Sequence, residues 1–201
     1  MNHQDLKRDA KLVLENGFIF EGYSFGSKGL VIGEIVFNTG MTGYQEVMTD
    51  PSYFGQIITF TYPEIGNTGI NFEDSESENN IVQAIIVRNY SNNLSNWRSK
   101  LTFNDWLVKN DVIGLHGIDT RALVKIIRKY GSMNGLITTE KITTDKCMEI
   151  LRKSPKMKGL NLANQVTTNK EYFWENNISS EFRSNDKLHS SKKFKVVVVD
   201  F

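Results

Sequence analysis

Hydroxyl, carboxylate and glycine residues gather in one short stretch, Gly33 to Gln56, which reads GEIVFNTGMTGYQEVMTDPSYFGQ. Side chains of these types line sites for small polar molecules, since a hydroxyl both donates and accepts hydrogen bonds. Ser52, near the end of this stretch, could present a hydroxyl to a polar ligand. The local alternative is a turn, because Asp50 and Pro51 are turn formers and Ser52 follows them naturally. No nucleophile–base pair stands out in this stretch, so the residues taken alone predict a folded module without its own catalytic centre.

Cys147 is the only thiol in the sequence and therefore the only candidate for a cysteine nucleophile. A reactive thiol needs a lowered pKa or an adjacent base. Cys147 falls on an expected short helix beside Lys146, with no glycine elbow around it. Isolated cysteines are commonly small buried hydrophobes, so we interpret Cys147 as a packing residue.

The three histidines, His3, His116 and His189, are not spaced like a set of metal ligands. We expect His3 and His189 to be solvated and His116 to be a packed or edge residue. The glycines of GSKGLVIGE lack the order of a phosphate-binding loop. The sequence therefore predicts no metal site and no cofactor bound by this segment.

The composition indicates a folded chain, with 39% apolar and 11% aromatic residues. Lys and Arg number 24 against 23 Asp and Glu, a net charge of +1, which gives no electrostatic reason to expect nucleic acid or an anionic membrane as a partner. A single cysteine excludes an internal disulfide and suits a reducing compartment. The polar N-terminus does not look like a signal peptide, and no apolar run approaches the length of a membrane span. We expect a cytoplasmic globular protein.

The elements around the Ser52 stretch are predicted to be strands. Residues 12–15 and 18–20 flank Asn16 and Gly17, a pair that predicts a β-hairpin with a type I′ turn. The acidic residues after position 72 are most simply a solvated loop. Further strands are predicted at residues 30–37, 56–61, 81–88 and 136–139.

Helices are predicted in the second half of the chain, each with a polar residue at its N-terminus. Thr102 caps the first, Asp119 the second, and Thr143 or Thr144 the third; Gly131 ends the second. Strands and helices mix without a strict βαβ rhythm, so we predict an α+β fold or a β/β/α arrangement. The apolar stripe expected on the second helix comprises Leu123, Ile126, Ile127 and Tyr130.

The C-terminal part differs in character. Residues 159–193 are rich in Asn, Ser, Thr and Lys, with isolated apolar anchors, and are interpreted as a connector. Residues 196–199 are four valines, a run typical of a strand buried on both faces of a parallel sheet. Such a strand needs neighbours and covering helices, and none follow, so we expect the front part of a longer protein. The predicted organisation is an N-terminal domain at 1–158, a connector at 159–193 and the first strand of another domain at 194–201.

Taken together, the motifs resemble one family, the small, glutamine-hydrolysing chain of carbamoyl-phosphate synthase. The similar stretches occur in family order and cover most of the chain from Leu12 to about Trp174. FNTGMTGYQEVMTDPSY and GIDTRAL are long and unusual, and KVVVVDF resembles the first strand of the family's glutaminase domain. The other similar stretches are QIITFTYPEIGNTGIN, VRNYSNNLSNWRSKLTFNDWL, GLHGIDTRALVKIIRKYGSMNGLI and GLNLANQVTT.

The resemblance implies an N-terminal domain of the swivelling β/β/α type, followed by a class I glutamine amidotransferase domain of α/β fold. In this family a cysteine thioester, assisted by a histidine and a glutamate, hydrolyses glutamine, and ammonia passes through a tunnel to the large chain. The large chain uses ATP and magnesium to convert bicarbonate and ammonia into carbamoyl phosphate, which feeds arginine and pyrimidine synthesis. The implied partner is therefore the large chain, in a heterodimer or a higher assembly.

The resemblance assigns one site residue. Ser52 matches the serine of the family's DPSY motif, which implies that it contributes to binding L-glutamine. The family's oxyanion segment, nucleophile cysteine and triad partners would lie beyond Phe201, and Cys147 does not match the setting of that nucleophile. We therefore expect no catalytic residue here, with ATP and magnesium bound on the large chain. The alternative is a non-catalytic module that binds the large chain; an independent small hydrolase is disfavoured by the missing nucleophile and base geometry.

Overall fold

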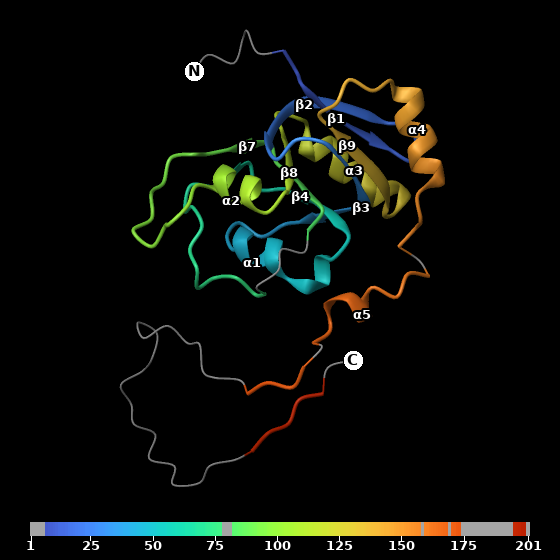
Figure 1. The fold of residues 1–201 in the computed structure, drawn as a ribbon. Coiled ribbons are helices and arrows are strands. Elements are labelled where there is room, and N and C mark those ends of the chain that lie inside the picture. Colours follow the sequence, from blue (N-terminus) through green and yellow to red (C-terminus); the bar gives the residue numbers. More distant parts are fainter. Residues whose placement is uncertain (1–6, 78–81, 158, 169, 174–194, 200–201) are drawn as a thin grey trace. The chain divides into compact units, whose positions relative to one another are not determined.

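The computed structural model describes residues 7–77, 82–157, 159–168, 170–173 and 195–199 (Figure 1). The chain divides into two units, residues 1–160 and 161–201. The first unit combines strands and helices, which confirms the predicted α+β class. The predicted domain boundaries at 158 and 193 stay a prediction.

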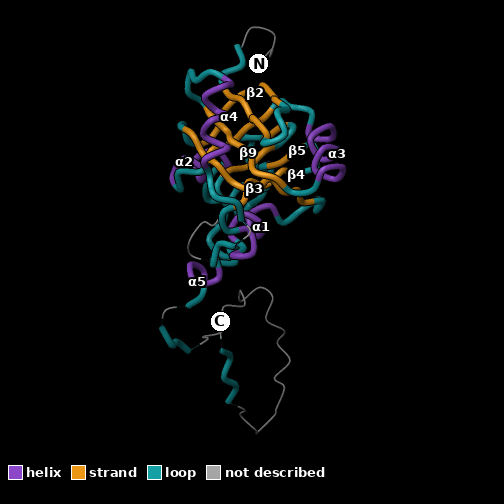
Figure 2. Tube along the Cα trace, turned by 90° about the vertical axis from the view of Figure 1, so that its right-hand side faces the viewer, coloured by secondary structure: helices purple, strands orange, loops and turns teal. Residues whose placement is uncertain are grey.

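Seven strands of the described chain close into a barrel, with helices on its outside (Figure 2). The order around it is β1, β2, β8, β6, β4, β3 and β9, with β9 returning to β1. The pairs β3–β4, β4–β6 and β6–β8 are parallel, and the remaining pairs are antiparallel. The strand bounds are β1 Ala10–Leu14, β2 Ile19–Gly26, β3 Leu30–Asn38, β4 Gln56–Phe60, β6 Ala84–Ile86, β8 Ile113–His116 and β9 Met133–Thr138. A two-stranded parallel sheet joins β5 Glu64–Ile65 to β7 Asn89–Tyr90.

Alternate strand residues fill the barrel. One buried apolar cluster takes residues from β1, β3, β4, β6, β8 and β9, as expected for side chains that point to one face with a period of two. The helix α3, Thr120–Tyr130, adds Leu123 and Ile127 to this cluster. Fully buried strand members of the cluster are Leu12, Leu14, Ile35, Ile57, Ala84, Ile86, Leu115 and Ile137.

The three predicted helices begin where the sequence indicates, whereas α1, Tyr44–Thr49, was not predicted. Thr102 caps α2, Phe103–Lys109, and Asp119 caps α3 by accepting a hydrogen bond from the Ala122 N–H at 2.9 Å. Thr143 caps α4, Thr144–Lys153, which lies along β1 and β9 (Figure 1). Figure 2 shows α2 and α3 on opposite sides of the barrel. One member of the predicted α3 stripe is wrong: Tyr130, the last residue of the helix, is 54% exposed.

The hairpin between β1 and β2 is confirmed, but its predicted type I′ turn is wrong. Leu14 and Phe18 close a three-residue loop, with the Leu14 N–H donating to the Phe18 carbonyl at 2.9 Å. A type I′ turn needs positive φ at both central residues, whereas Gly17 has φ 89° and Asn16 is not in the positive-φ region. Only glycine adopts the left-handed conformation here, as in a three-residue hairpin loop.

The second unit contains the short helix α5, Ala163–Val166. Residues 195–199, predicted as a buried strand, form no strand among the described residues, and the four valines are 65–85% exposed. A buried parallel strand requires a hydrogen-bonded neighbour on each side, and the described chain supplies none to this segment. Tyr172 and Phe173 of the predicted connector are exposed, and Trp174 lies outside the described residues.

Candidate functional site at the Asp50 turn

Ser52 lies in the connection between β3 and β4, two parallel neighbours in the barrel. Parallel strands require a crossover, and here it contains α1, Tyr44–Thr49, and a short 3-10 helix η2, Pro51–Tyr53. The crossover enters β4 at Gln56. Ser52 is exposed on this connection, which places its hydroxyl within reach of a ligand or a neighbouring protein surface.

Asp50 fixes the backbone of Ser52. Its Oδ1 accepts a hydrogen bond from the Ser52 N–H at 2.8 Å, and its carbonyl oxygen accepts one from the Tyr53 N–H at 3.0 Å. Pro51 takes the first helical position, where its fixed φ fits and a missing N–H costs nothing. The predicted turn is therefore confirmed. The Ser52 hydroxyl makes no hydrogen bond within the described chain, so it is available to a ligand.

Tyr53 anchors this turn to the barrel. The Asn38 Nδ2 donates a hydrogen bond to the Tyr53 hydroxyl at 3.1 Å, and Asn38 is the last residue of β3. The Asn38 Oδ1 also accepts from the Gly40 N–H at 2.8 Å, at the start of the same crossover. Both ends of the crossover are thus held by one side chain. Sequence reasoning missed Asn38, since no local pattern links residues 15 positions apart.

Thr49 ties the end of α1 to residues 71–77. Its hydroxyl accepts a hydrogen bond from the Glu76 N–H at 2.9 Å, and its carbonyl accepts one from the Ser77 hydroxyl at 2.7 Å. At the other end of this segment, the Gln45 side chain bonds both the N–H and the carbonyl of Asn71, at 3.0 and 2.6 Å. The predicted solvated acidic loop is therefore, in its described part, fastened to α1 along its length.

Two groups near the start of α1 have raised pKa values. Burial raises the pKa of Tyr44 to about 12, and its hydroxyl donates to the Gly69 carbonyl at 2.6 Å. Burial also raises the pKa of Glu46, and the charges of Asp74 and Glu76 add repulsion. The phenol therefore stays neutral at physiological pH and acts as a structural hydrogen-bond donor.

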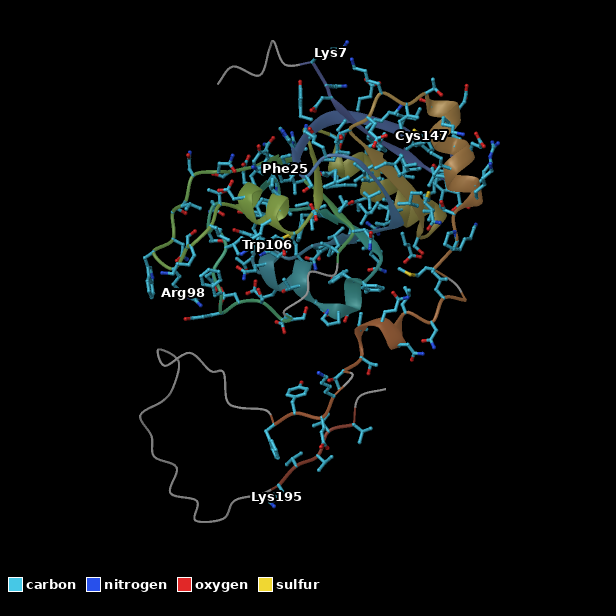
Figure 3. The ribbon with its side chains drawn as sticks, in the orientation of Figure 1. Lys7, Phe25, Arg98, Trp106, Cys147 and Lys195 are labelled. Carbon is cyan, nitrogen blue, oxygen red and sulfur yellow. The ribbon has the colours of Figure 1, made fainter. Side chains whose placement is uncertain are left out.

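The remaining candidates of the sequence are structural. Cys147 is fully buried on the side of α4 that faces the strands, in a cluster with Val13, Leu136 and Leu151 (Figure 3). His116 is packed as predicted, and its ring centroid lies 4.9 Å from that of Tyr90. His3 and His189 lie outside the described residues. No base accompanies Cys147 in its apolar cluster, so the setting does not suit a nucleophile.

The described ranges contain no group of three or more His, Cys, Asp or Glu residues that could hold a metal ion. A cavity of about 450 Å³ opens between residues 27–31, 82–83 and 110–113, with Phe54 at its edge. A smaller one of about 140 Å³ lies at the start of α1, lined by residues 43–46, 68–69, 71, 74 and 96. Neither includes Ser52, so the Asp50 turn is a surface element that presents a hydroxyl and encloses no ligand by itself.

The family model described as "Carbamoyl-phosphate synthase small chain, CPSase domain" matches residues 12–137. The chain is 57% identical over 133 residues to the carbamoyl phosphate synthase small chain of Synechocystis sp. (strain ATCC 27184 / PCC 6803 / Kazusa), covering 66% of this chain and 35% of that protein. It is 44% identical over 194 residues to the small chain of Parasynechococcus marenigrum (strain WH8102), covering 96% of this chain and 51% of that protein.

A third relative, the carbamoyl phosphate synthase small chain of Clostridium perfringens (strain 13 / Type A), is 56% identical over 131 residues, which are 65% of this chain and 38% of that protein. The crossover falls within the region that the family model matches, and so do the barrel strands apart from residues 10, 11 and 138 at the ends of β1 and β9. The chain belongs to the carbamoyl-phosphate synthase small chain family, through that family's N-terminal domain. It spans between about a third and a half of the length of these relatives.

Within the described part of the chain, no helix is both long and apolar enough to cross a membrane.

Proposed function

We propose that this chain acts in the small subunit of a glutamine-dependent carbamoyl-phosphate synthase, which supplies ammonia from glutamine for the synthesis of carbamoyl phosphate from bicarbonate and ATP. Family membership over residues 12–137 is the observation that carries this proposal. The product serves arginine and pyrimidine biosynthesis. The partner is the synthase large chain, which binds the ATP and magnesium, and this segment binds no cofactor.

In this proposal the domain supports glutamine hydrolysis without performing it. Ser52 contacts L-glutamine through its hydroxyl, and Asp50 fixes the Ser52 backbone from the preceding cap position. A hydroxyl can donate to the carbonyl end of glutamine or accept from its amide, which orients the substrate without attacking it. The setting of Cys147 supports this division, since a fully buried thiol cannot meet a solvent-borne substrate. The nucleophile would come from a class I glutamine amidotransferase domain.

The proposed family role also implies which of the family's domains each part of this chain forms. We assign the barrel unit to the swivelling β/β/α type, and residues 194–201 to the first strand of the glutaminase domain. Four exposed valines support the second assignment, because such a run gains stability only when neighbouring strands and helices bury it.

The test is a Ser52→Ala substitution in the assembled synthase, with glutamine and ammonia compared as nitrogen donors. We expect the KM for glutamine to rise, by about tenfold if one hydrogen bond worth about 1.4 kcal/mol is lost. Ammonia-supported synthesis should remain near the parental rate, because ammonia bypasses the glutamine site. Equal loss with both donors would instead indicate a docking or folding defect and contradict the role of Ser52.

The second candidate is a non-catalytic module that binds the large chain. The observation that favours it is the absence of a nucleophile–base pair around Cys147, the cysteine of the described chain. Co-purification with the large chain, without glutamine-supported synthesis, would favour the non-catalytic module. Glutamine-supported synthesis by the same complex would favour the glutamine-dependent subunit.

A further inference from the structure

Two neighbouring loops, the first at residues 66–77 after β5 and the second at residues 91–102 between β7 and α2, expose large apolar side chains outside the Asp50 turn. Trp97 is 77% exposed, Phe72 is 74% exposed and Leu94 is 45% exposed. Single exposed apolar residues are ordinary, but tryptophan and phenylalanine gathered on adjoining loops are typical of protein-binding surfaces. We name Phe72, Leu94 and Trp97 the aromatic loop surface.

Arg98 clamps the two loops together. Its Nη2 donates to Glu73 Oε2 at 2.9 Å and to Asp74 Oδ1 at 2.8 Å, so the residue after Trp97 is bonded to the two residues after Phe72. Figure 3 shows Arg98 at the outer edge of the barrel unit. A guanidinium that bonds two carboxylates has little freedom to rotate. The clamp therefore keeps Phe72 and Trp97 on a common framework.

The backbone beneath this surface is also fixed. The Ser95 N–H donates to the Asn67 carbonyl at 2.9 Å. Gly69 has φ 68°, and a methyl group there would lie 2.0 Å from Ser99 Oγ and 2.8 Å from Leu94 Cδ2. Only glycine fits this approach of the two loops. Loops ordered before binding lose less conformational entropy in a complex, which favours their use as a docking surface.

The surface is acidic. Glu46, Glu73, Asp74 and Glu76 lie on α1 and the first loop, and Asp74 and Glu76 both repel the charge of Glu46. Arg98 offsets part of this charge through its two ion pairs, and Lys100 is the other cation on the second loop. A complementary partner therefore carries an excess of positive charge around its apolar contact.

A small cavity beside this surface is also lined by acidic side chains. It measures about 140 Å³ and is lined by Glu46, Asn71, Asp74 and Asn96 among others. Small-molecule sites usually measure about 300–1,000 Å³, so this cavity suits a single side chain better than a cofactor. The Asp74 carboxylate is already bonded to Arg98, so Glu46 is the cavity carboxylate that fits a lysine or arginine side chain reaching in from a partner.

We infer that the aromatic loop surface docks a protein partner that presents an apolar pocket edged by lysine and arginine, with one cationic side chain entering the acidic cavity. The inference rests on the proposed function in one respect: the partner is the large chain of the synthase. Trp97, the most exposed of the three, is the main anchor, and Phe72 and Leu94 add apolar contacts.

The test measures binding of this chain to the large chain of the same organism by biolayer interferometry. Trp97→Ala and Phe72→Ala are compared with Tyr130→Ala, an aromatic residue 54% exposed on α3. Glu76→Lys is compared with Glu21→Lys, an exposed carboxylate on β2. We expect Trp97→Ala to weaken binding by at least about 30-fold, as an interface hot spot does, and Glu76→Lys by about tenfold with reduced salt dependence. The two controls should bind like the parent, and circular dichroism should show all five variants folded.

Each other outcome overturns a defined part of the inference. If the parent binds and Trp97→Ala and Glu76→Lys bind equally well, the surface is wrong while the proposed function stands. If the parent does not bind the large chain, both the proposed function and this docking assignment fail. If the parent self-associates in sedimentation and Trp97→Ala abolishes it, the occupant is a second copy of this chain and the large-chain assignment is wrong.

Discussion

The Asp50 cap offers a direct test of how the candidate site is held. The Asp50 Oδ1 accepts the Ser52 N–H at 2.8 Å, and Asp50→Ala removes that acceptor. Loss of an N-terminal cap costs about 1 kcal/mol of unfolding free energy, within a range of about 0.5–2 kcal/mol. For a folded unit of the size of residues 1–160, losing about 1 kcal/mol of unfolding free energy lowers Tm by about 2–4 °C.

The matched control is Asp50→Asn, because asparagine keeps a side-chain oxygen acceptor and caps helices about as well as aspartate. Urea unfolding followed by circular dichroism should place Asp50→Asn within a few tenths of a kcal/mol of the parent. In the assembled synthase, Asp50→Ala should also raise the KM for glutamine, and Asp50→Asn should restore it. Parental stability of Asp50→Ala would refute the cap, and equal losses in both variants would show that the charge matters and the acceptor does not.

Three further predictions test the core and its electrostatics. Cys147 should not react with a thiol reagent until the chain unfolds, and Cys147→Ser should cost about 1–3 kcal/mol by burying a hydroxyl; ammonia release by this chain that Cys147→Ser abolishes would contradict its structural role. Gly114→Ala places a methyl group 2.4 Å from Phe25 Cε1 and should cost about 1–3 kcal/mol in urea unfolding, partly recovered by adding Phe25→Leu. Burial opposes ionisation of Asp9, but hydrogen bonds led by Lys28 outweigh it and lower its pKa from 3.8 to about 2. The folded pKa is the lower one, so this contribution to stability is present above pH 3.8 and disappears as the pH falls towards 2, and Asp9→Asn should remove that part of the acid dependence in a pH series of melts.

Local features of the fold could be predicted because they depend on neighbours in the sequence. The caps at Thr102, Asp119 and Thr143 follow from a polar residue placed three positions before the N–H it accepts. The Asp50 turn follows from the same short-range logic. The hairpin was also predictable, but its turn type was not. The pair Asn16–Gly17 fits both a two-residue type I′ turn and a three-residue loop that ends in a left-handed glycine.

The exposed valines at 196–199 mark another limit of sequence reasoning. A continuous apolar run predicts a buried strand, but the run contains no information about which strands would pair with it. The described residues supply no such pairing, and the valines remain 65–85% exposed. Burial is a property of the assembled sheet, so the sequence predicts the tendency and the neighbours decide the outcome.

By itself, the sequence determined the family of this protein, its α+β class, the starts of α2, α3 and α4, and the turn that presents Ser52. Only the tertiary structure decided that seven strands close into a barrel, that Asn38 holds Tyr53, and that Arg98 joins the loops carrying Phe72 and Trp97. The physical reason is separation along the chain. A cap bonds groups three residues apart, whereas the Asn38 and Arg98 contacts join residues 15 to 25 positions apart and exist only once strand register has brought them together.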